Sequence, residues 1–126
     1  MIIKQLSVFL QNELGRLEDV TDVLYKNNIN ISALCIAETA EYGVLRMIVS
    51  DTDKAAVALR DNDFSVKSTD VICIEAPDVP GALHETVKLL SAAGINLSYM
   101  YGYSNAGKAH LILKVSDPEK AIQILK

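Results

Sequence analysis

The chain has 126 residues and a formal net charge of −4; half of its residues are hydrophobic and 22% are charged. This length suits one domain of ordinary size or two very small ones, and the apolar content favours a packed core over disorder. The twelve Lys and Arg residues are scattered without a basic stripe, which argues against nucleic-acid binding and against an anionic membrane surface. No apolar run approaches the ~20 residues that span a bilayer, so no membrane helix is expected.

The first half of the chain predicts strand, helix, strand, strand, helix and strand, in that order. Apolar residues alternate around position 8, as in a half-buried strand, and then recur at helical spacing from Leu17 to Leu24. Residues 30–39 and 44–49 are predicted strands joined by a turn at 41–43. Asp51 is placed to cap a second helix, and residues 64–67 form a last short strand.

The second half of the chain repeats this order. It predicts a strand at residues 71–75, a helix from about 80 to 93, strands at 96–103 and 108–115, and a helix that starts at Pro118. The three residues before Val71 are a minimal linker, so the two adjoining strands are expected to form nearly one. At the same spacing a final strand would begin near position 130, so we expect either a longer native chain or a second sheet without its edge strand.

The two halves match in sequence at a constant offset of 66 positions. The matching pairs, all at this offset, include Gly15 with Gly81, Leu17 with Leu83, Leu24 with Leu90, Asn30 with Asn96, and Ser50 with Ser116. Chance identities do not keep one register over such a length. We therefore predict two copies of one small unit, residues 1–68 and 69–126. Each is α+β and ferredoxin-like (βαββαβ), with an antiparallel sheet and both helices on one face.

The turn before the first helix of each copy can bind an anion. A helix begins at Gly81, so free N–H groups and the positive end of the helix dipole face outward, and a carboxylate is the natural ligand. Asn96 opens the next strand, and its side chain can accept a hydrogen bond from an ammonium group, with Asp78 either capping the helix or assisting. Taken singly, an Asp before Pro-Gly is more often a turn and cap, and such an Asn more often a strand-entry residue.

One combination of features resembles the ACT domain, a small amino-acid-sensing module. It consists of the motif DxPGxL, then an amphipathic helix, and then GINL. The second copy fits this pattern well. The first departs from it, since Asn12 stands where Asp is usual, Leu14 replaces Pro, and Asn28 replaces Gly.

The resemblance implies two units packed side by side with ligands in the seam, where the turn of one faces the second strand of the other. Carried over by position, it names one group of ligand-binding residues, namely Asn12, Leu14, Gly15, Arg16 and Leu17, with Asn96. It names a reciprocal group, namely Asp78, Val79, Pro80, Gly81, Ala82 and Leu83, with Asn30.

Three further patterns bear on ligand and location. Tyr99, Tyr101 and Tyr103 alternate along one strand, so they share a face; they form either an aromatic wall or ordinary sheet packing. This row favours histidine or an aromatic amino acid as the expected ligand.

The cysteines and histidines indicate neither a disulfide nor a metal site. Cys35 and Cys73 form no CxxC motif, which is typical of reduced thiols in a cytoplasmic protein. The two histidines have no metal-ligand spacing, so no metal or other cofactor is expected.

No catalytic residue set is recognisable, so we do not expect an enzyme. The main hypothesis is a regulatory protein that binds a free amino acid between its two units, as a homodimer. The alternative is a regulatory subunit that docks onto an enzyme of amino-acid metabolism and carries a degenerate ligand site. A small hydrolase of phosphate esters or acyl phosphates is a third reading, supported only by Arg16 in the first turn.

Overall fold

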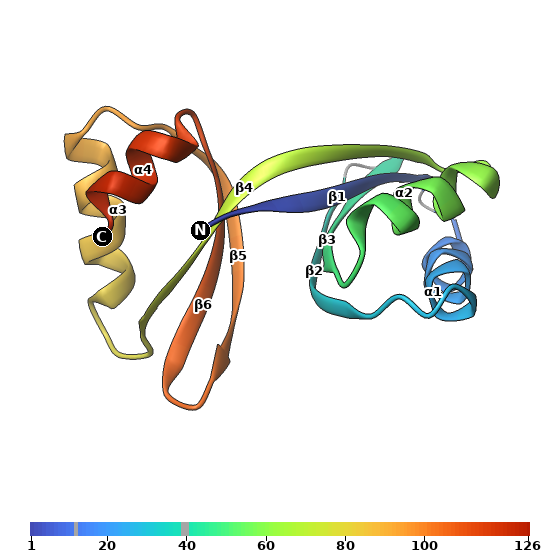
Figure 1. The fold of residues 1–126 in the computed structure, drawn as a ribbon, viewed down its shortest axis with the longest axis horizontal. Coiled ribbons are helices and arrows are strands. Elements are labelled where there is room, and N and C mark those ends of the chain that lie inside the picture. The colour runs from blue at the N-terminus through green and yellow to red at the C-terminus, as the bar shows by residue number, and fades with distance from the viewer. Residues whose placement is uncertain (12, 39–40) are drawn as a thin grey trace. The chain divides into compact units, whose positions relative to one another are not determined.

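The computed structural model describes residues 1–11, 13–38 and 41–126. The elements follow one another as β1 (Ile2–Gln11), α1 (Arg16–Lys26), β2 (Ile31–Glu38), β3 (Tyr42–Val49), α2 (Thr52–Asp61), β4 (Ser65–Pro77), α3 (Ala82–Ala92), β5 (Leu97–Asn105), β6 (Lys108–Val115) and α4 (Pro118–Ile124) (Figure 1). This order confirms the predicted α+β fold of two ferredoxin-like units. Strand β4 is the last strand of the first copy and the first strand of the second, and in the described residues no strand follows α4, as predicted for a second unit without its last strand. The predicted turn at 41–43 was too long, because Tyr42 and Gly43 already pair with β1.

The chain divides into two compact units. The N-terminal unit is Lys4–Thr69, and the C-terminal unit joins Met1–Ile3 to Asp70–Lys126. The long strand β4 belongs to both units, since it runs without interruption from residue 65 to 77. The minimal linker at residues 68–70 is therefore ordinary strand, as its sequence predicted.

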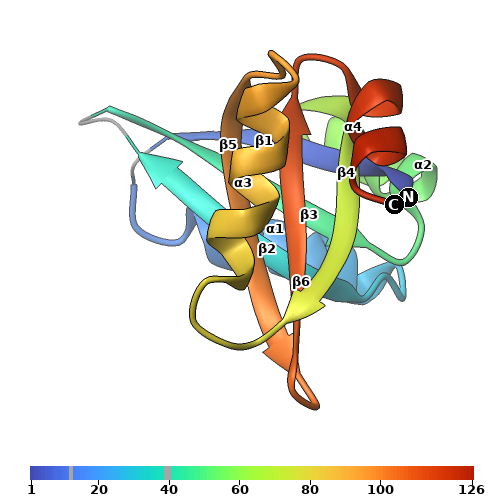
Figure 2. The ribbon, with the colours of Figure 1, turned by 90° about the vertical axis from the view of Figure 1, so that its left-hand side faces the viewer.

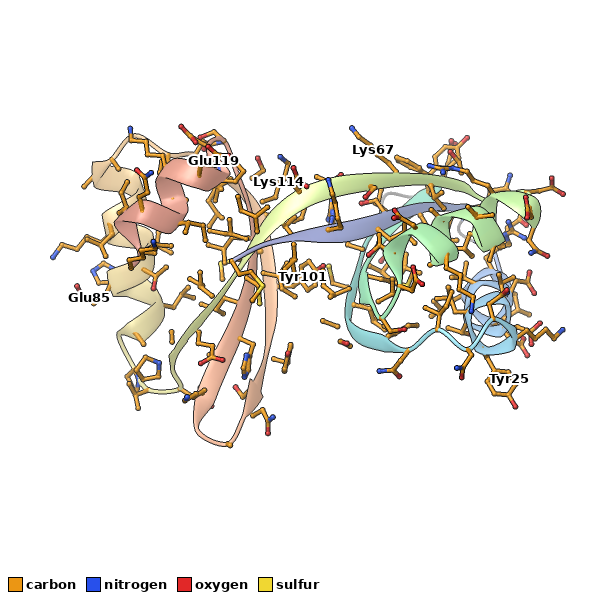
Figure 3. All side chains as sticks on the ribbon, in the orientation of Figure 1. Tyr25, Lys67, Glu85, Tyr101, Lys114 and Glu119 are labelled. Carbon is orange, nitrogen blue, oxygen red and sulfur yellow. The ribbon has the colours of Figure 1, made fainter. Side chains whose placement is uncertain are left out.

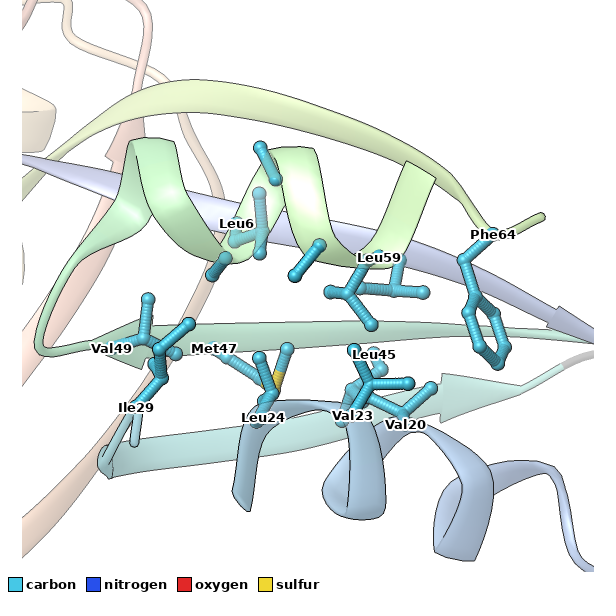
Figure 4. Close-up of a cluster of buried hydrophobic side chains, with 14 of the residues drawn as sticks. Leu6, Val20, Val23, Leu24, Ile29, Leu45, Met47, Val49, Leu59 and Phe64 are labelled. Atoms are coloured by element: carbon cyan, nitrogen blue, oxygen red, sulfur yellow. The ribbon is translucent and has the colours of Figure 1, made fainter. Parts of the chain in front are cut away.

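The N-terminal unit has an antiparallel sheet with its core on one face. Strand β3 lies between β1 and β2, with Leu6 opposite Met47 and Val8 opposite Leu45. These four side chains are fully buried, and they pack with residues of α1 and α2 (Figure 4). Alternation along β1 places Leu6, Val8 and Leu10 on this face, as expected for a sheet covered on one side by helices.

The C-terminal unit repeats this arrangement. Strand β6 pairs antiparallel with β4 and with β5, and α3 and α4 cover one face of these strands (Figure 2). Its core includes Ile72, Leu90, Leu113 and Ala121. Beyond β4, Met1 and Cys73 exchange both backbone hydrogen bonds, of 2.8 and 3.2 Å. A pair that exchanges both bonds is typical of antiparallel strands. The start of β1 thus lies on the edge of β4 where the offset predicted that a last strand was missing.

The two copies end their first helices in the same way despite a difference in sequence. Asn28 has φ of 57° and Gly94 has φ of 73°, both in the left-handed region. In each copy the next residue donates a backbone hydrogen bond across the helix end, Ile29 to Leu24 and Ile95 to Leu90. This is the Schellman motif, which takes Gly most often and Asn sometimes. The substitution of Asn28 for Gly therefore preserves the backbone.

The shared left-handed backbone at Asn28 and Gly94 predicts how substitutions at Gly94 change the free energy of unfolding. Gly94→Asn is expected to cost less than about 0.5 kcal/mol of unfolding free energy, because asparagine tolerates the left-handed region, whereas Gly94→Val is expected to cost about 1–2 kcal/mol or more. Urea unfolding of the two variants measures both values. Equal costs for the two variants would contradict the assigned backbone conformation.

Candidate functional site

The helices α1 and α3 begin without a side-chain cap from any described residue. The N-cap residues are Gly15 and Gly81, with φ of 88° and 91°. By contrast, α2 and α4 are capped by Asp51 and Asp117, whose carboxylates each accept a 3.1 Å hydrogen bond from a backbone N–H. A helix end normally satisfies its free N–H groups with a side chain, water or a ligand. The two turns before α1 and α3 therefore leave donors for a ligand.

Both N-cap glycines lie beside open space. Their left-handed backbone disfavours any residue with a Cβ, yet a Cβ built at either position would meet no atom within 4 Å. The glycine is thus required by the backbone and not by a neighbouring side chain. The open space leaves room for a bound molecule to approach the N–H groups.

Asn30 and Asn96 are held at equivalent places by equivalent serines. The Asn96 N–H donates to Ser116 Oγ at 3.0 Å and its carbonyl accepts from the Ser116 N–H at 2.9 Å; Ser50 makes the same two bonds to Asn30. Both asparagines are exposed. These bonds use only the backbone atoms of each asparagine, so the side-chain amide takes no part in them.

Within a unit, the turn and the asparagine do not meet. Gly15 precedes α1 and Asn30 follows it, and a helix of 11 residues is about 16 Å long. The same separation holds for Gly81 and Asn96 across α3. A single amino acid cannot touch both ends of such a helix. The combination of one unit's turn with the other unit's asparagine therefore stays a prediction.

Seven of the thirteen residues predicted for the site line three hollows, each within one unit. Arg16 and Leu17 line a hollow of about 160 Å³ together with Leu10, Gln11, Glu13, Ile36, Glu38 and Gly43. Val79, Pro80, Gly81 and Ala82 line an open one of about 580 Å³ with Glu75, Ala76, Pro77, Glu85 and Thr86. Asn96 lines a third, of about 500 Å³, with Val87, Leu90, Ser91, Gly94, Ile95 and Leu97.

Other predicted site residues have simpler surroundings. Leu14 is fully exposed on its turn, and Leu83 is 44% exposed on α3. Asp78 donates its backbone N–H to the Gly107 carbonyl, but no hydrogen bond joins its carboxylate to α3 among the described residues. The suggestion that Asp78 caps the helix was therefore wrong. Asn12 lies outside the described residues.

The sequence reasoning missed Glu13, Ile36 and Glu38. Glu38 ends β2, and in an antiparallel unit the end of β2 lies at the same end as the turn that follows β1. This topology was predicted, so it could have indicated these residues. The repeat itself does not single them out, because none of the three is identical to its equivalent in the second copy.

Arg16 distinguishes the first turn from the second, where Ala82 is the equivalent residue. The Arg16 guanidinium lies 4.6 Å above the centre of the Phe64 ring, and its Nη1 lies 3.4 Å from the Asp19 carboxylate. Its Nε is buried and has no hydrogen-bond partner among the described residues. An unsatisfied buried donor is unfavourable, and this one is enclosed by protein atoms.

The tyrosine row is on β5 of the C-terminal unit. Tyr99, Tyr101 and Tyr103 pair with Lys114, Ile112 and His110 of β6. Tyr101 points away from α3 and α4 (Figure 3), and the alternation of side chains along β5 places Tyr99 and Tyr103 on the same face. Tyr103 stacks on His110 with ring centres 4.8 Å apart. The row therefore shares one face, as its spacing predicted. The lining of the three hollows described above includes none of these tyrosines.

Other chemistry is sparse. Cys35 and Cys73 are free thiols, and partial burial raises the pKa of both, which disfavours the reactive thiolate. Among residues 1–11, 13–38 and 41–126, no three His, Cys, Asp or Glu side chains are grouped to hold a metal ion. None of the helices in this part of the chain is long and apolar enough to cross a membrane.

Comparison with known proteins gives the family. The sequence profile of the ACT domain pair matches residues 1–126, so the chain belongs to the ACT domain pair family. A comparison with curated proteins finds no match.

Solved structures agree with this family. Protein BT0572 from Bacteroides thetaiotaomicron is 53% identical, with a TM-score of 0.95 over 99% of this chain and 87% of that one. The ligand-free regulatory subunit of aspartate kinase from Thermus thermophilus is 11% identical, with a TM-score of 0.72 over 99% and 95%. The structure of the aspartokinase alpha and beta subunits is 15% identical in sequence, with a TM-score of 0.67 over 98% of this chain and 93% of that one. The last two similarities establish a shared fold.

The difference in capping predicts different effects of three aspartate substitutions. Asp51→Ala and Asp117→Ala are each expected to lower the free energy of unfolding by about 1 kcal/mol, because each removes a helix cap. Asp78→Ala is expected to change it by less than about 0.5 kcal/mol, because Asp78 caps no helix. Thermal or urea unfolding compares the three. A cost at Asp78 as large as at Asp117 would show that α3 has a cap in solution.

Proposed function

We propose that this protein binds a free amino acid and acts as a regulatory ligand sensor. The observation that carries the proposal is the pair of uncapped helix starts, each behind a left-handed glycine, in a member of the ACT domain pair family. Such a helix start suits the carboxylate of the ligand. Asn30 or Asn96, with a free side-chain amide, suits its ammonium group.

The ligand is proposed to lie between the two units. A helix start contributes only about 1 kcal/mol, whereas micromolar to sub-millimolar affinity needs about 5–8 kcal/mol. An exposed turn does not supply this alone, so a second surface must enclose the ligand. The resemblance to ACT pairs supplies that surface, with the turn of one unit opposite the asparagine of the other. The bound ligand would then favour one arrangement of the units over another.

A second candidate function follows from the shared fold. Regulatory subunits of aspartate kinase have the same fold, although their low identity carries no ligand or partner to this chain. The alternative is therefore a subunit that docks onto an enzyme of amino-acid metabolism, with a ligand site that no longer binds. Copurification with such an enzyme and no amino-acid binding would favour this alternative.

Three further properties belong to the proposal. A homodimer is expected from the exposed apolar surface, which includes Leu34 and Ile36 at the edge of the first sheet. A cytoplasmic location is expected from the two free thiols. A histidine or aromatic ligand, expected from the tyrosine row, stays a prediction.

Calorimetric titration with each of the twenty amino acids tests the function. One or a few are expected to bind, and Asn96→Ala is expected to weaken binding at least about tenfold, because a hydrogen bond to a charged group is lost. The Asn96 backbone keeps its bonds to Ser116, so the fold is preserved. Asn105→Ala, at an exposed asparagine of the same unit, is the matched control. The absence of any binding would overturn the proposal.

A further inference from the structure

The N-terminal unit closes one end of its core with an aromatic ring. Phe64 is 6% exposed and belongs to the buried cluster of that unit, where its ring lies near Leu59 (Figure 4). Val23, which lines a small hollow together with Phe64, is 8% exposed. Phe64 directly precedes β4, whose first residues lie beside β1 in the sheet. A ring and the strand that follows it therefore cover this end of the first core.

The C-terminal unit has an open hollow of about 580 Å³ at the equivalent place. In the first unit, Leu10 and Val20 share the buried cluster with Phe64, and Arg16 and Asp19 line a hollow with it. At the constant offset, their equivalents are Ala76, Thr86, Ala82 and Glu85, and all four line the hollow of the second unit. The hollow thus corresponds to the space that the Phe64 ring occupies in the first unit.

Apolar surface around this hollow is less covered than in the first unit. Leu89, the equivalent of Val23, is 47% exposed on α3. Ile74, the equivalent of the fully buried Val8, is only partly buried against the second core. The residues that line the hollow include no aromatic side chain. An aromatic side chain placed there would bury apolar surface, as Phe64 does in the first unit.

The strand edge beside the hollow has free backbone groups. Cys73 exchanges both of its backbone hydrogen bonds with Met1, on the side of β4 that faces away from β6. Residues two apart in a strand direct their backbone groups to the same side, so the Glu75 N–H and carbonyl face this edge too. On that side no backbone hydrogen bond joins Glu75 to a described residue. An extended segment can therefore continue the pairing that Met1 begins.

The charge of the hollow indicates what such a segment carries. Two carboxylates, Glu75 and Glu85, line the hollow, and no cation does. Glu75 lies 3.5 Å from the Lys108 ammonium, whereas Glu85 forms no ion pair with a described residue. In the first unit, the equivalent Asp19 holds the Arg16 guanidinium, which lies 4.6 Å above the centre of the Phe64 ring. Since Ala82 replaces Arg16, an occupant with its own cation suits Glu85.

We propose that the hollow and the β4 edge at Glu75 form a docking site for an extended segment of a partner protein. The segment carries an aromatic residue, an apolar residue two positions after it, as in Phe64 and Val66, and a basic residue two positions before it. The ring enters the hollow, the main chain pairs with Glu75, and the cation lies near Glu85. This surface is distinct from the amino-acid sensor and does not depend on it.

NMR titration of the full chain with capped peptides tests the inference. The first peptide has the sequence of residues 62–69, NDFSVKST, and is expected to shift the backbone amide signals of Glu75 and Glu85. The same peptide with Phe64→Ala is expected to bind at least about tenfold more weakly, because the ring is the anchor. The peptide with Asn62→Arg is expected to bind at least about threefold more tightly, and Glu85→Gln in the protein is expected to remove that gain.

Two substitutions at one position test the strand pairing. Glu75→Pro and Glu75→Ala both remove the carboxylate, but only proline also removes the outward N–H, and an edge strand tolerates proline there. Glu75→Pro is expected to weaken binding of the first peptide at least about tenfold, and Glu75→Ala by less than about threefold. Thermal unfolding shows whether each variant is folded. If Glu75→Pro does not fold, the comparison of the peptides decides without it.

Several outcomes would overturn the inference. The Phe64→Ala peptide could bind as tightly as the first one, or the shifted amides could lie outside β4 and α3. A folded Glu75→Pro variant with full affinity would exclude the strand pairing, and an Asn62→Arg peptide without gain would exclude the basic residue. A dimer of this chain that the peptide dissociates would assign the site to a second copy instead of a partner. The absence of binding by all three peptides overturns the docking site and leaves the amino-acid sensor, which calorimetry tests separately, in place.

Discussion

The left-handed backbone at Gly15 and Gly81 decides what the two turns can do. A chain that enters a helix through this conformation places no side chain where Asp51 and Asp117 stand before α2 and α4. The N–H groups at the start of α1 and α3 are therefore left to solvent or to a ligand. A polar side chain there would stabilise the helix and would also occupy the N–H groups that the proposed ligand needs. This trade of helix stability for available donors is typical of a binding site.

The two copies show how one scaffold can carry different surfaces. The helix C-terminus is the same at Asn28 and Gly94, and the serine that anchors each asparagine is also the same. The copies differ at the first turn and at the end of the following strand, where Glu13, Arg16 and Glu38 have Val79, Ala82 and Ser104 as their equivalents. The backbone at these places is thus the same in both copies, although the side chains of the two turns differ.

The fold was predictable from the sequence because the same order of strands and helices is recognisable in both copies of the repeat. The alternation at Leu6 and Val8, the Pro118 helix start and the continuous strand through residues 68–70 all follow from local rules. The pairing of Met1 with Cys73 did not follow, since it joins the first residues to a strand 72 positions away. Glu38 was missed because its place beside the first turn follows from the strand topology and not from a sequence motif. The Asp78 cap was wrong because a left-handed Gly81 changes the direction of the chain before the helix.

Backbone amide NMR during titration with each amino acid that binds in calorimetry tests the central claim most directly. The account predicts that the amide signals of Leu17 and Glu18 at the start of α1, or of Leu83 and His84 at the start of α3, shift with ligand concentration. The amides of Lys54 and Lys120, which donate to the capping aspartates, are expected to stay in place. Binding that leaves the α1 and α3 amides unshifted would contradict the account.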